Sequence, residues 1–450
     1  MSTDVLHLLP LVPEGVLEIC QRLREKGKRG WIVGGCVRDL LRGGAAKDWD
    51  VCTDARPDEV VALFRKVIPT GMQHGTVTVV LRGAHYEVTT LRGEGAYSDG
   101  RRPDKVEFVD DITADLARRD FTFNAMAIDP IDGHLIDPFG GRGDLAARVL
   151  RAVGDAGERF FEDGLRVLRA ARFSATLECA IAPATEAAMG APRSLDTFRR
   201  VSAERVRDEW LKAMSAARPS VAFEAMRRTG LLAVTCPELE ATVGIEPGNT
   251  AVDDVYHRSL AALDACQGAP ILRLAALLHG VGQARSPADH ARLGAEVAEA
   301  ILTRLKLSND ERARVTALIR HQAIGYASTW TDAAVRRFIR RVTRELLGDL
   351  HTLCVAIAGT SPRAAEEIRG LEELRERVSA QLAQGAALST RDLKLNGRDL
   401  MVSLGLAPGR IVGETLERLL EQVTDDPALN EREALLAAAR TLLAEPRAAT

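Results

Sequence analysis

The chain has 450 residues, too many for one ordinary hydrophobic core, so we expect two to four domains. Apolar residues make up 46% and charged residues 27%, a balance typical of soluble globular proteins, and no uncharged apolar run is long enough to span a membrane. The net charge of −3 neither requires nor excludes a nucleic-acid partner. No secretory signal is visible, and the seven cysteines form no CxxC pair, so we expect free thiols in a cytoplasmic protein.

The first 150 residues predict an α+β head built on a mixed sheet. Amphipathic and capping patterns indicate three helices, and alternating or short apolar runs indicate the strands between and after them. A glycine-rich polar stretch follows the fourth strand, and we expect a loop there over residues 93–104. The predicted elements are helices over 14–28, 36–43 and 57–67, strands over 30–34, 48–53, 75–83 and 85–92, and a hairpin of 123–129 with 134–138.

Beyond residue 145 almost every segment has a helical period and is rich in Ala, Leu, Arg and Glu. Breaks in that period are expected near 235–250 and 325–332, with interruptions near 396–397 and 408–409. The sequence therefore predicts an all-α remainder divided into several helical units.

Two aspartates on the second predicted strand form the first candidate site. Asp48 and Asp50 are two positions apart, and side chains alternate along a strand, so both carboxylates lie on one face. Upstream, Gly34 and Gly35 permit a close backbone approach to phosphate, and Arg38 offers a forked donor to a triphosphate. Paired carboxylates suit Mg²⁺ together with substrate phosphates. This pattern predicts metal-assisted nucleotidyl transfer.

A third carboxylate, Glu87, lies on the strand predicted over 85–92 and is the candidate to complete the catalytic set. The segment RRDFTFNAMA (118–127) supplies further polar candidates, Arg119, Asp120 and Asn124. Two interpretations stay open for this segment. The residues form a helix cap and turn, or Asp120 and Asn124 contact the nucleotide sugar while Arg119 contacts the phosphates.

The segment EDGLRVLRAARF (162–173) contains Asp163 and Arg166, which are three residues apart and share a helix face. Such a pair is either an ordinary surface ion pair or a base-recognition pair. An arginine donor beside a carboxylate acceptor matches cytosine and adenine, which present a ring acceptor next to an amino group, and rejects uracil and guanine. We expect Glu162 and Arg169 to hold the pair in register.

These segments, in this order, resemble the class II tRNA nucleotidyltransferase and poly(A) polymerase family, with the CCA-adding enzymes as the best match. The matching residues span about 30–215, and the one visible departure is Gly164, where the family commonly has proline. The resembling segments are VGGCVRDLL (33–41), KDWDVCTDA (47–55), TGMQHGTVTVV (70–80), RRDFTFNAMA (118–127), DPFGGRGDL (137–145), EDGLRVLRAARF (162–173) and VSAERVRDEW (201–210).

The resemblance implies a polymerase-beta-like nucleotidyltransferase head (1–148) and a helical neck and body for base recognition and RNA binding (149–245). A degenerate HD-like unit (246–332) and a helical tail for tRNA binding (333–450) would follow. It assigns catalysis and Mg²⁺ binding to Asp48 and Asp50, with Glu87 as third carboxylate. The loop over 93–104 resembles the family's flexible loop, which is associated with the switch from C to A addition. The nucleotide-binding residues that it implies are Gly34, Gly35, Arg38, Arg119, Asp120, Asn124, Asp163, Arg166 and Arg169.

The unit over 251–323 resembles an HD-type phosphohydrolase domain, because His257, His279, His290 and His321 fall near its histidine positions. The expected His-Asp pair is here His279–Gly280, so a metal ligand is missing. We therefore expect a structural or RNA-contacting role for this unit.

The predicted activity is the template-independent addition of CMP, CMP and AMP from CTP and ATP to the 3′ end of tRNA, with Mg²⁺ as cofactor and no membrane partner. Three alternatives stay open: an enzyme that adds only A or makes poly(A), an HD-domain phosphohydrolase, and a non-catalytic RNA-binding protein. The sequence does not define an oligomeric state.

Overall fold

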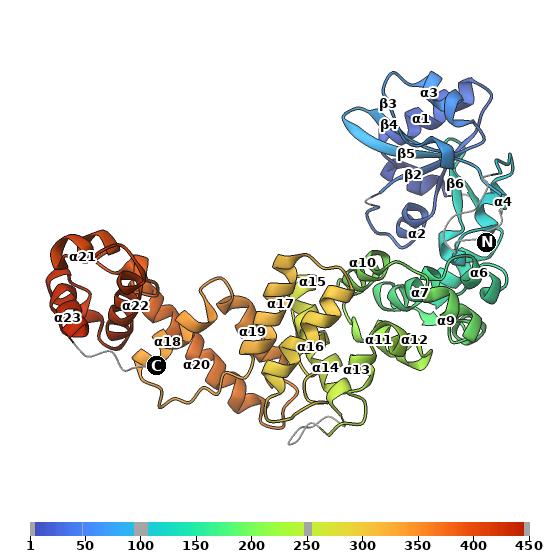
Figure 1. The fold of residues 1–450 in the computed structure, drawn as a ribbon. Coiled ribbons are helices and arrows are strands. Elements are labelled where there is room, and N and C mark those ends of the chain that lie inside the picture. Colours follow the sequence, from blue (N-terminus) through green and yellow to red (C-terminus); the bar gives the residue numbers. More distant parts are fainter. Residues whose placement is uncertain (1–4, 47, 94–106, 247–253, 445–450) are drawn as a thin grey trace. The chain divides into compact units, whose positions relative to one another are not determined.

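The computed structural model describes residues 5–46, 48–93, 107–246 and 254–444 (Figure 1). They form two compact units, residues 1–240 with 304–306, and residues 241–303 with 307–450. The finer division into four domains stays a prediction, and the loop predicted over 93–104 falls, beyond Gly93, outside the described residues. None of the described helices is both long and apolar enough to cross a membrane.

A mixed sheet of seven strands organises the described part of the head, in the order β3-β4-β5-β2-β1-β6-β7 (Figure 1). Neighbouring strands are antiparallel except β2 and β5, which are parallel. This arrangement confirms the predicted α+β head. The strands are β1 (Gly30–Val33), β2 (Asp50–Thr53), β3 (Val67–Gly71), β4 (Thr76–Leu81), β5 (Ala84–Thr90), β6 (Ala127–Asp129) and β7 (His134–Ile136).

Apolar side chains on one sheet face build one cluster of the head's core. Trp31, Val33 and Cys52 pack there with Ile112 and Leu116 of α4, and all five are buried. Burying such side chains contributes roughly 25 cal/mol per Å² of apolar surface. The helices of the head are α1 (Glu14–Glu25), α2 (Gly35–Leu41), α3 (Pro57–Leu63), α4 (Ile112–Ala117) and α5 (Gly141–Ala146), with 3₁₀ turns η1 (Leu6–Leu11), η2 (Met72–His74) and η3 (Thr122–Asn124).

Several local predictions in the head were wrong in their bounds. The strand predicted over 48–53 begins only at Asp50, so Asp48 lies outside it. The helix predicted over 57–67 ends at Leu63, because Val67–Gly71 forms β3 and pairs with β4. The strand predicted over 123–129 begins only at Ala127, since Thr122–Asn124 makes a 3₁₀ turn. The turn between β4 and β5 uses Arg82 and Gly83, both with positive φ, and Ala84 already lies in β5.

The rest of the first unit is helical, as predicted, apart from the short parallel pair β8 (Val149–Leu150) and β9 (Ala180–Ile181). The α7 helix buries most of its length, and Phe173 on it contacts Phe121 and Phe123 of the head edge-on. The helices are α6 (Ala156–Glu162), α7 (Leu165–Thr176), α8 (Pro183–Met189), α9 (Pro192–Phe198), α10 (Ala203–Ala213), α11 (Ser220–Arg228), α12 (Leu231–Thr235) and α13 (Pro237–Glu240).

The second unit is all-α in its described residues, and the predicted breaks coincide with helix ends. Asn396 caps α21 by accepting the amides of Arg398 and Asp399, and α22 begins directly after Gly409. The helices are α14 (Val255–Ala265), α15 (Pro270–Leu278), α16 (His290–Arg304), α17 (Asn309–His321), α18 (Asp332–Val342), α19 (Leu347–Ala358), α20 (Ala364–Ala383), α21 (Gly397–Leu404), α22 (Arg410–Asp425) and α23 (Arg432–Ala444), with 3₁₀ turns η4 (Thr390–Asp392) and η5 (Pro427–Leu429).

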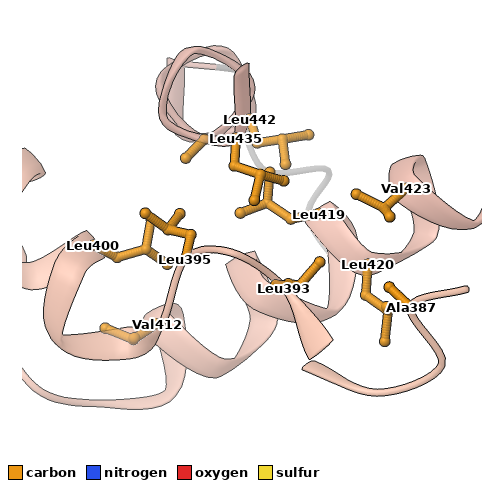
Figure 2. Close-up of a cluster of buried hydrophobic side chains, with 11 residues drawn as sticks. Ala387, Leu393, Leu395, Leu400, Val412, Leu419, Leu420, Val423, Leu435 and Leu442 are labelled. Carbon is orange, nitrogen blue, oxygen red and sulfur yellow. The ribbon is translucent and has the colours of Figure 1, made fainter. Parts of the chain in front are cut away.

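The C-terminal helices have an apolar core of their own. Figure 2 shows this cluster, in which side chains from α21, α22 and α23 point toward one another. Leu400, Leu419 and Leu435 are its most deeply buried leucines from these three helices. The helical period of the apolar positions in these segments therefore puts them on the faces where α21, α22 and α23 pack together.

Candidate active site

A glycine turn between β1 and α2 forms one wall of the candidate site. Gly34 has φ +77°, which side chains rarely adopt, and a Cβ there would lie 2.9 Å from Nη1 of Arg119. Gly35 opens α2, and Arg38 lies one turn further along that helix. Glycine at position 34 is thus required both by the backbone and by the closeness of the Arg119 guanidinium.

The carboxylates predicted from the sequence lie at the start of β2 and on β5. Asp50 and Glu87 are directly paired in the parallel register of these strands, and Asp48 lies two residues before Asp50. All three residues are exposed: Asp48 precedes β2, Asp50 begins it, and Glu87 lies in the middle of β5. The structure thus brings Asp50 and Glu87 together, although they are far apart in the sequence.

The electrostatics of this group suit a cation. The pKa of Asp50 is raised, first because surrounding protein atoms partly desolvate its carboxyl and then because Glu87 and Asp48 add negative charge. Arg119 acts in the opposite direction. Among the residues that the structure describes, no three His, Cys, Asp or Glu side chains form a complete metal cage. Mg²⁺ does not need one, because it keeps several waters and binds through one or two carboxylates plus substrate phosphates.

A hydrogen-bonded chain connects α2, η3 and α7 beside the glycine turn. Arg38 donates from Nη1 to Oδ1 of Asn124 over 2.8 Å, and Asn124 donates from Nδ2 to Oδ1 of Asp120 over 3.0 Å. Arg169 closes the chain on Oδ2 of Asp120, at 2.9 Å from Nε and 2.6 Å from Nη2. Burial alone would raise the pKa of Asp120, but Arg169 and Asn124 together outweigh it and lower that pKa to about 2. Asp120 is therefore ionised and fixed.

The prediction that Asp163 and Arg166 share a helix face was wrong, because Asp163 has an extended backbone in the break between α6 and α7, while Arg166 lies in the first turn of α7. Each side chain has its own partners. Arg205 on α10 donates to both oxygens of Asp163, at 3.1 and 2.7 Å. Arg166 donates from Nη1 to Glu162 and to the Arg159 carbonyl, and from Nη2 to the Arg118 carbonyl. Glu162 holds Arg166 as expected, whereas Arg169 hydrogen-bonds to Asp120 instead of Asp163.

Sequence reasoning missed two residues of this region. Arg205 lies in VSAERVRDEW, a segment recognised as family-like but given no role, and its partner Asp163 is 42 positions away. Asp115 on α4 is fully buried and accepts hydrogen bonds from Arg118 and Arg119. Arg205 belongs to no local pattern that would have singled it out. Asp115 stands three and four positions before Arg118 and Arg119, a spacing that indicates an ion pair but not its burial.

The HD-like histidines do not form a metal centre in the described part of the second unit. His279 is buried, its Nδ1 lies 2.8 Å from the Ala276 carbonyl, and burial lowers its pKa to about 4. A Cβ at Gly280 would lie 2.7 Å from Val255 and 2.9 Å from the Ser259 hydroxyl. An aspartate at position 280 therefore finds no room in this packing.

Three family models match the chain. The poly(A) polymerase head domain matches residues 30–151, the probable RNA- and SrmB-binding site of polymerase A matches 180–242, and a putative second domain of tRNA nucleotidyltransferases matches 289–439. With the carboxylates on β2 and β5 and the glycine turn after β1, these matches define a nucleotidyltransferase, a class of enzyme that uses divalent metal ions.

Similarity to individual proteins narrows this class. The CCA-adding enzyme of Levilactobacillus brevis is 34% identical over 439 residues, covering 96% of this chain and 99% of the relative. That of Lactobacillus johnsonii is 45% identical over 223 residues, which cover 50% of this chain and about half (55%) of the relative. The crystal structure of the Bacillus stearothermophilus CCA-adding enzyme in complex with CTP superposes with a TM-score of 0.74 at 32% identity, covering 96% of this chain and 97% of that one. The chain belongs to the family of CCA-adding enzymes.

Proposed function

We propose that this protein adds CMP, CMP and AMP from CTP and ATP to the 3′ end of tRNA without a nucleic-acid template, releasing pyrophosphate at each step. The observation that carries the proposal is the register of β2 and β5, which sets Asp50 beside Glu87 next to Arg119 and the glycine turn. The similarity to CCA-adding enzymes over nearly the whole chain supports tRNA as the acceptor.

In this reaction the terminal 3′-hydroxyl of the tRNA attacks the α-phosphate of the nucleotide, and pyrophosphate leaves. Asp48 and Asp50 would hold Mg²⁺, with Glu87 as the third carboxylate. Bound there, Mg²⁺ supplies charge compensation at the phosphates and lowers the pKa of the attacking hydroxyl. The chain's own arginines, Arg38 and Arg119, neutralise the triphosphate beside Gly34 and Gly35.

Asp120 and Asn124 contact the sugar in this proposal. Their hydrogen bonds to Arg169 and Arg38 support this role, because both side chains are held in one orientation before the nucleotide binds. Preorganised polar groups lose little entropy on binding.

Base selection is assigned to Asp163 and Arg166. Arg205 holds both oxygens of the Asp163 carboxylate, which in this proposal accepts from the amino group of cytosine or adenine. The described hydrogen bonds of Arg166 use three of its five N–H donors, so that a donor is left for the acceptor nitrogen of the base. Uracil and guanine would place a carbonyl against the carboxylate and an N–H against the arginine.

The helical parts are proposed to bind the acceptor arm of tRNA through shape and backbone phosphates, so that binding weakens as salt rises. The cytoplasm is the proposed location, which the seven free, buried cysteines support.

The test offers three tRNAs, lacking CCA, lacking CA, or lacking only the final A, with each of the four nucleotides labelled in turn. We expect C, C and A to be added in order, with no use of UTP or GTP. If the protein adds only A, and only to the tRNA that lacks the final A, it is an A-adding enzyme. If it adds long A tails to unrelated RNA, it is a poly(A) polymerase. The double variant Asp48→Asn with Asp50→Asn is the matched control, since full activity in that protein would reject the proposed carboxylate mechanism.

A further inference from the structure

A fully buried carboxylate, Asp115, lies behind the candidate site on α4. Its Oδ1 accepts from Nε of Arg118 at 3.0 Å, from Nη2 of Arg118 at 2.6 Å and from the Arg92 amide at 3.2 Å. Its Oδ2 accepts from Nη2 of Arg119 at 3.2 Å and lies 3.8 Å from the Cys52 sulfur. One side chain thus joins the end of β5, the second strand β2 and two consecutive arginines.

Asp115 is ionised in this environment. Burial alone would raise its pKa, but Arg118 and Arg119, with the Arg92 amide, outweigh burial and lower it. Placing a charge where it has no exposure is costly unless several donors compensate it. An apolar residue would fill this position equally well if only packing were needed. The buried charge of Asp115 therefore indicates a role beyond packing.

Asp115 fixes the position of the Arg119 guanidinium. Its Nη2 is held by Asp115 and contacts the Cys52 sulfur at 3.6 Å, while its Nη1 lies 2.9 Å from the point where Gly34 would carry a Cβ. Its Nε is buried and has no hydrogen-bond partner among the described residues. The guanidinium is therefore held by one edge and presents the other to the glycine turn.

Other anions compete for this guanidinium. Asp50 and Asp120 both interact electrostatically with Arg119. Without the charge of Asp115, Arg119 would lose the carboxylate that holds its Nη2, and nothing would oppose the attraction of Asp50 and Asp120.

We propose that Asp115 is a positioning residue that holds Arg119 at the glycine turn for the nucleotide phosphates. This inference rests on the proposed function and deepens it. Asp115 touches neither substrate nor metal and acts only through Arg119.

The test measures CTP and ATP binding by calorimetry in the absence of tRNA, and KM and kcat with tRNA. Asp115→Asn is expected to weaken nucleotide binding and raise KM about tenfold, as for loss of a charged hydrogen bond, with kcat within about twofold. Arg119→Ala should show at least the same loss. In the Arg119→Ala background, Asp115→Asn should add nothing, because its effect passes through the missing guanidinium. An additive loss in the double variant, or unchanged nucleotide affinity in Asp115→Asn, overturns the inference.

Asp129→Asn is the matched control. Asp129 is also buried in the head and accepts from Arg24 at 3.0 Å, but it lies at the end of β6 opposite the end that adjoins Gly34, and among the described residues it has no hydrogen bond or ion pair with Arg119. We expect this variant to lose stability and keep its nucleotide affinity.

Should Asp115→Asn fail to fold, the double variant Asp115→Asn with Arg118→Leu removes one charge of each sign and tests the same inference. Wild-type nucleotide affinity in that protein overturns the inference, and a tenfold loss supports it. A wild-type protein that binds no nucleotide would instead refute the proposed function, so the two failures are distinguishable.

Discussion

Arg205 grips both carboxylate oxygens of Asp163, joining α10 to the start of α7 across 42 positions of sequence. Both side chains are largely shielded from solvent, at 22% and 17% exposure. A two-pronged guanidinium–carboxylate contact fixes the plane of the carboxylate as well as its position. The residue proposed to select the base is thus oriented by another helix.

Replacing Arg205 should therefore damage nucleotide selection more than catalysis. We expect Arg205→Ala to lower kcat/KM for CTP and ATP about 10- to 100-fold, because the carboxylate loses a charged partner and its fixed plane. Discrimination against UTP and GTP should fall at the same time. Single-nucleotide incorporation on tRNA lacking CCA measures both quantities.

The exposed pair of Arg199 with Asp196 supplies the control. Arg199→Ala should leave kcat/KM and selectivity unchanged, because an exposed ion pair contributes little. Unchanged selectivity in Arg205→Ala would show that Asp163 does not depend on Arg205.

We expect Asp50 to be required for activity and, at the same time, to destabilise the folded protein. Its raised pKa reflects partial desolvation and repulsion from Glu87 and Asp48, so a neutral side chain relieves both. Asp50→Asn should reduce kcat by at least about 10³-fold while its melting temperature stays equal or rises. Rate assays and thermal melts on the same preparation check this. A melting temperature that falls with activity would indicate a structural role instead.

The parts of the site that follow from short-range rules were predictable from the sequence. The glycine required at position 34 depends only on neighbouring residues. The strand predicted to carry both Asp48 and Asp50 begins only at Asp50, so strand alternation does not relate the two carboxylates. The pairing of Asp50 with Glu87 depends on a parallel contact between β2 and β5, which no local pattern encodes.

The contacts that orient the site were not predictable. Arg205 contacts Asp163, and Asp115 contacts Arg92, only once distant elements have packed together. The sequence around each residue gives no sign of these contacts. Short elements were missed for a related reason. The strands β8 and β9 have two residues each, too few for an alternating pattern. The 3₁₀ turn η3 occupies the start of an apolar run that looks like a strand throughout.

The second unit should lose stability in mild acid. His279 has a folded-state pKa of about 4, below the 6.5 of an exposed histidine, because burial disfavours its charged form. The unfolded chain therefore binds the proton first, and stability is complete above pH 6.5 and falls as the pH drops from 6.5 to 4. The loss amounts to about 3 kcal/mol at most. Urea melts followed across this range measure it.

Other groups titrate in the same direction, since the pKa values of His321 and His351 are also lowered, mainly by burial. His279→Gln isolates the share of His279. We expect its stability to vary less between pH 6.5 and 4 than that of the wild type. An identical slope would show that His279 is not buried in solution.

Restoring the HD carboxylate should not restore a metal site. In Gly280→Asp the new Cβ meets the Val255 side chain at 2.7 Å and the Ser259 hydroxyl at 2.9 Å, so these side chains of α14 or the backbone at position 280 must shift. Overpacking of this kind costs about 1–3 kcal/mol, and a buried unpaired carboxylate adds to it. We expect a lower melting temperature and no gain in Zn²⁺ or Mn²⁺ binding by calorimetry. Stoichiometric binding of either metal to the variant would contradict this expectation.

The end of α22 depends on a buried arginine from α18. Arg336 donates from Nε to the Thr424 carbonyl at 2.7 Å, from Nη2 to the Asp425 carbonyl at 3.1 Å and from Nη1 to Gln381 at 2.7 Å. It thereby satisfies carbonyls that a helix C-terminus leaves without intrahelical donors. Arg336→Met should cost about 2–4 kcal/mol of unfolding free energy, since these acceptors stay buried without a charged partner. Arg337→Met, which removes only exposed ion pairs with Asp425 and Glu421, should cost less than about 1 kcal/mol. Urea unfolding of the two variants measures the difference, and equal losses would show that the carbonyl contacts of Arg336 do not stabilise the helix end.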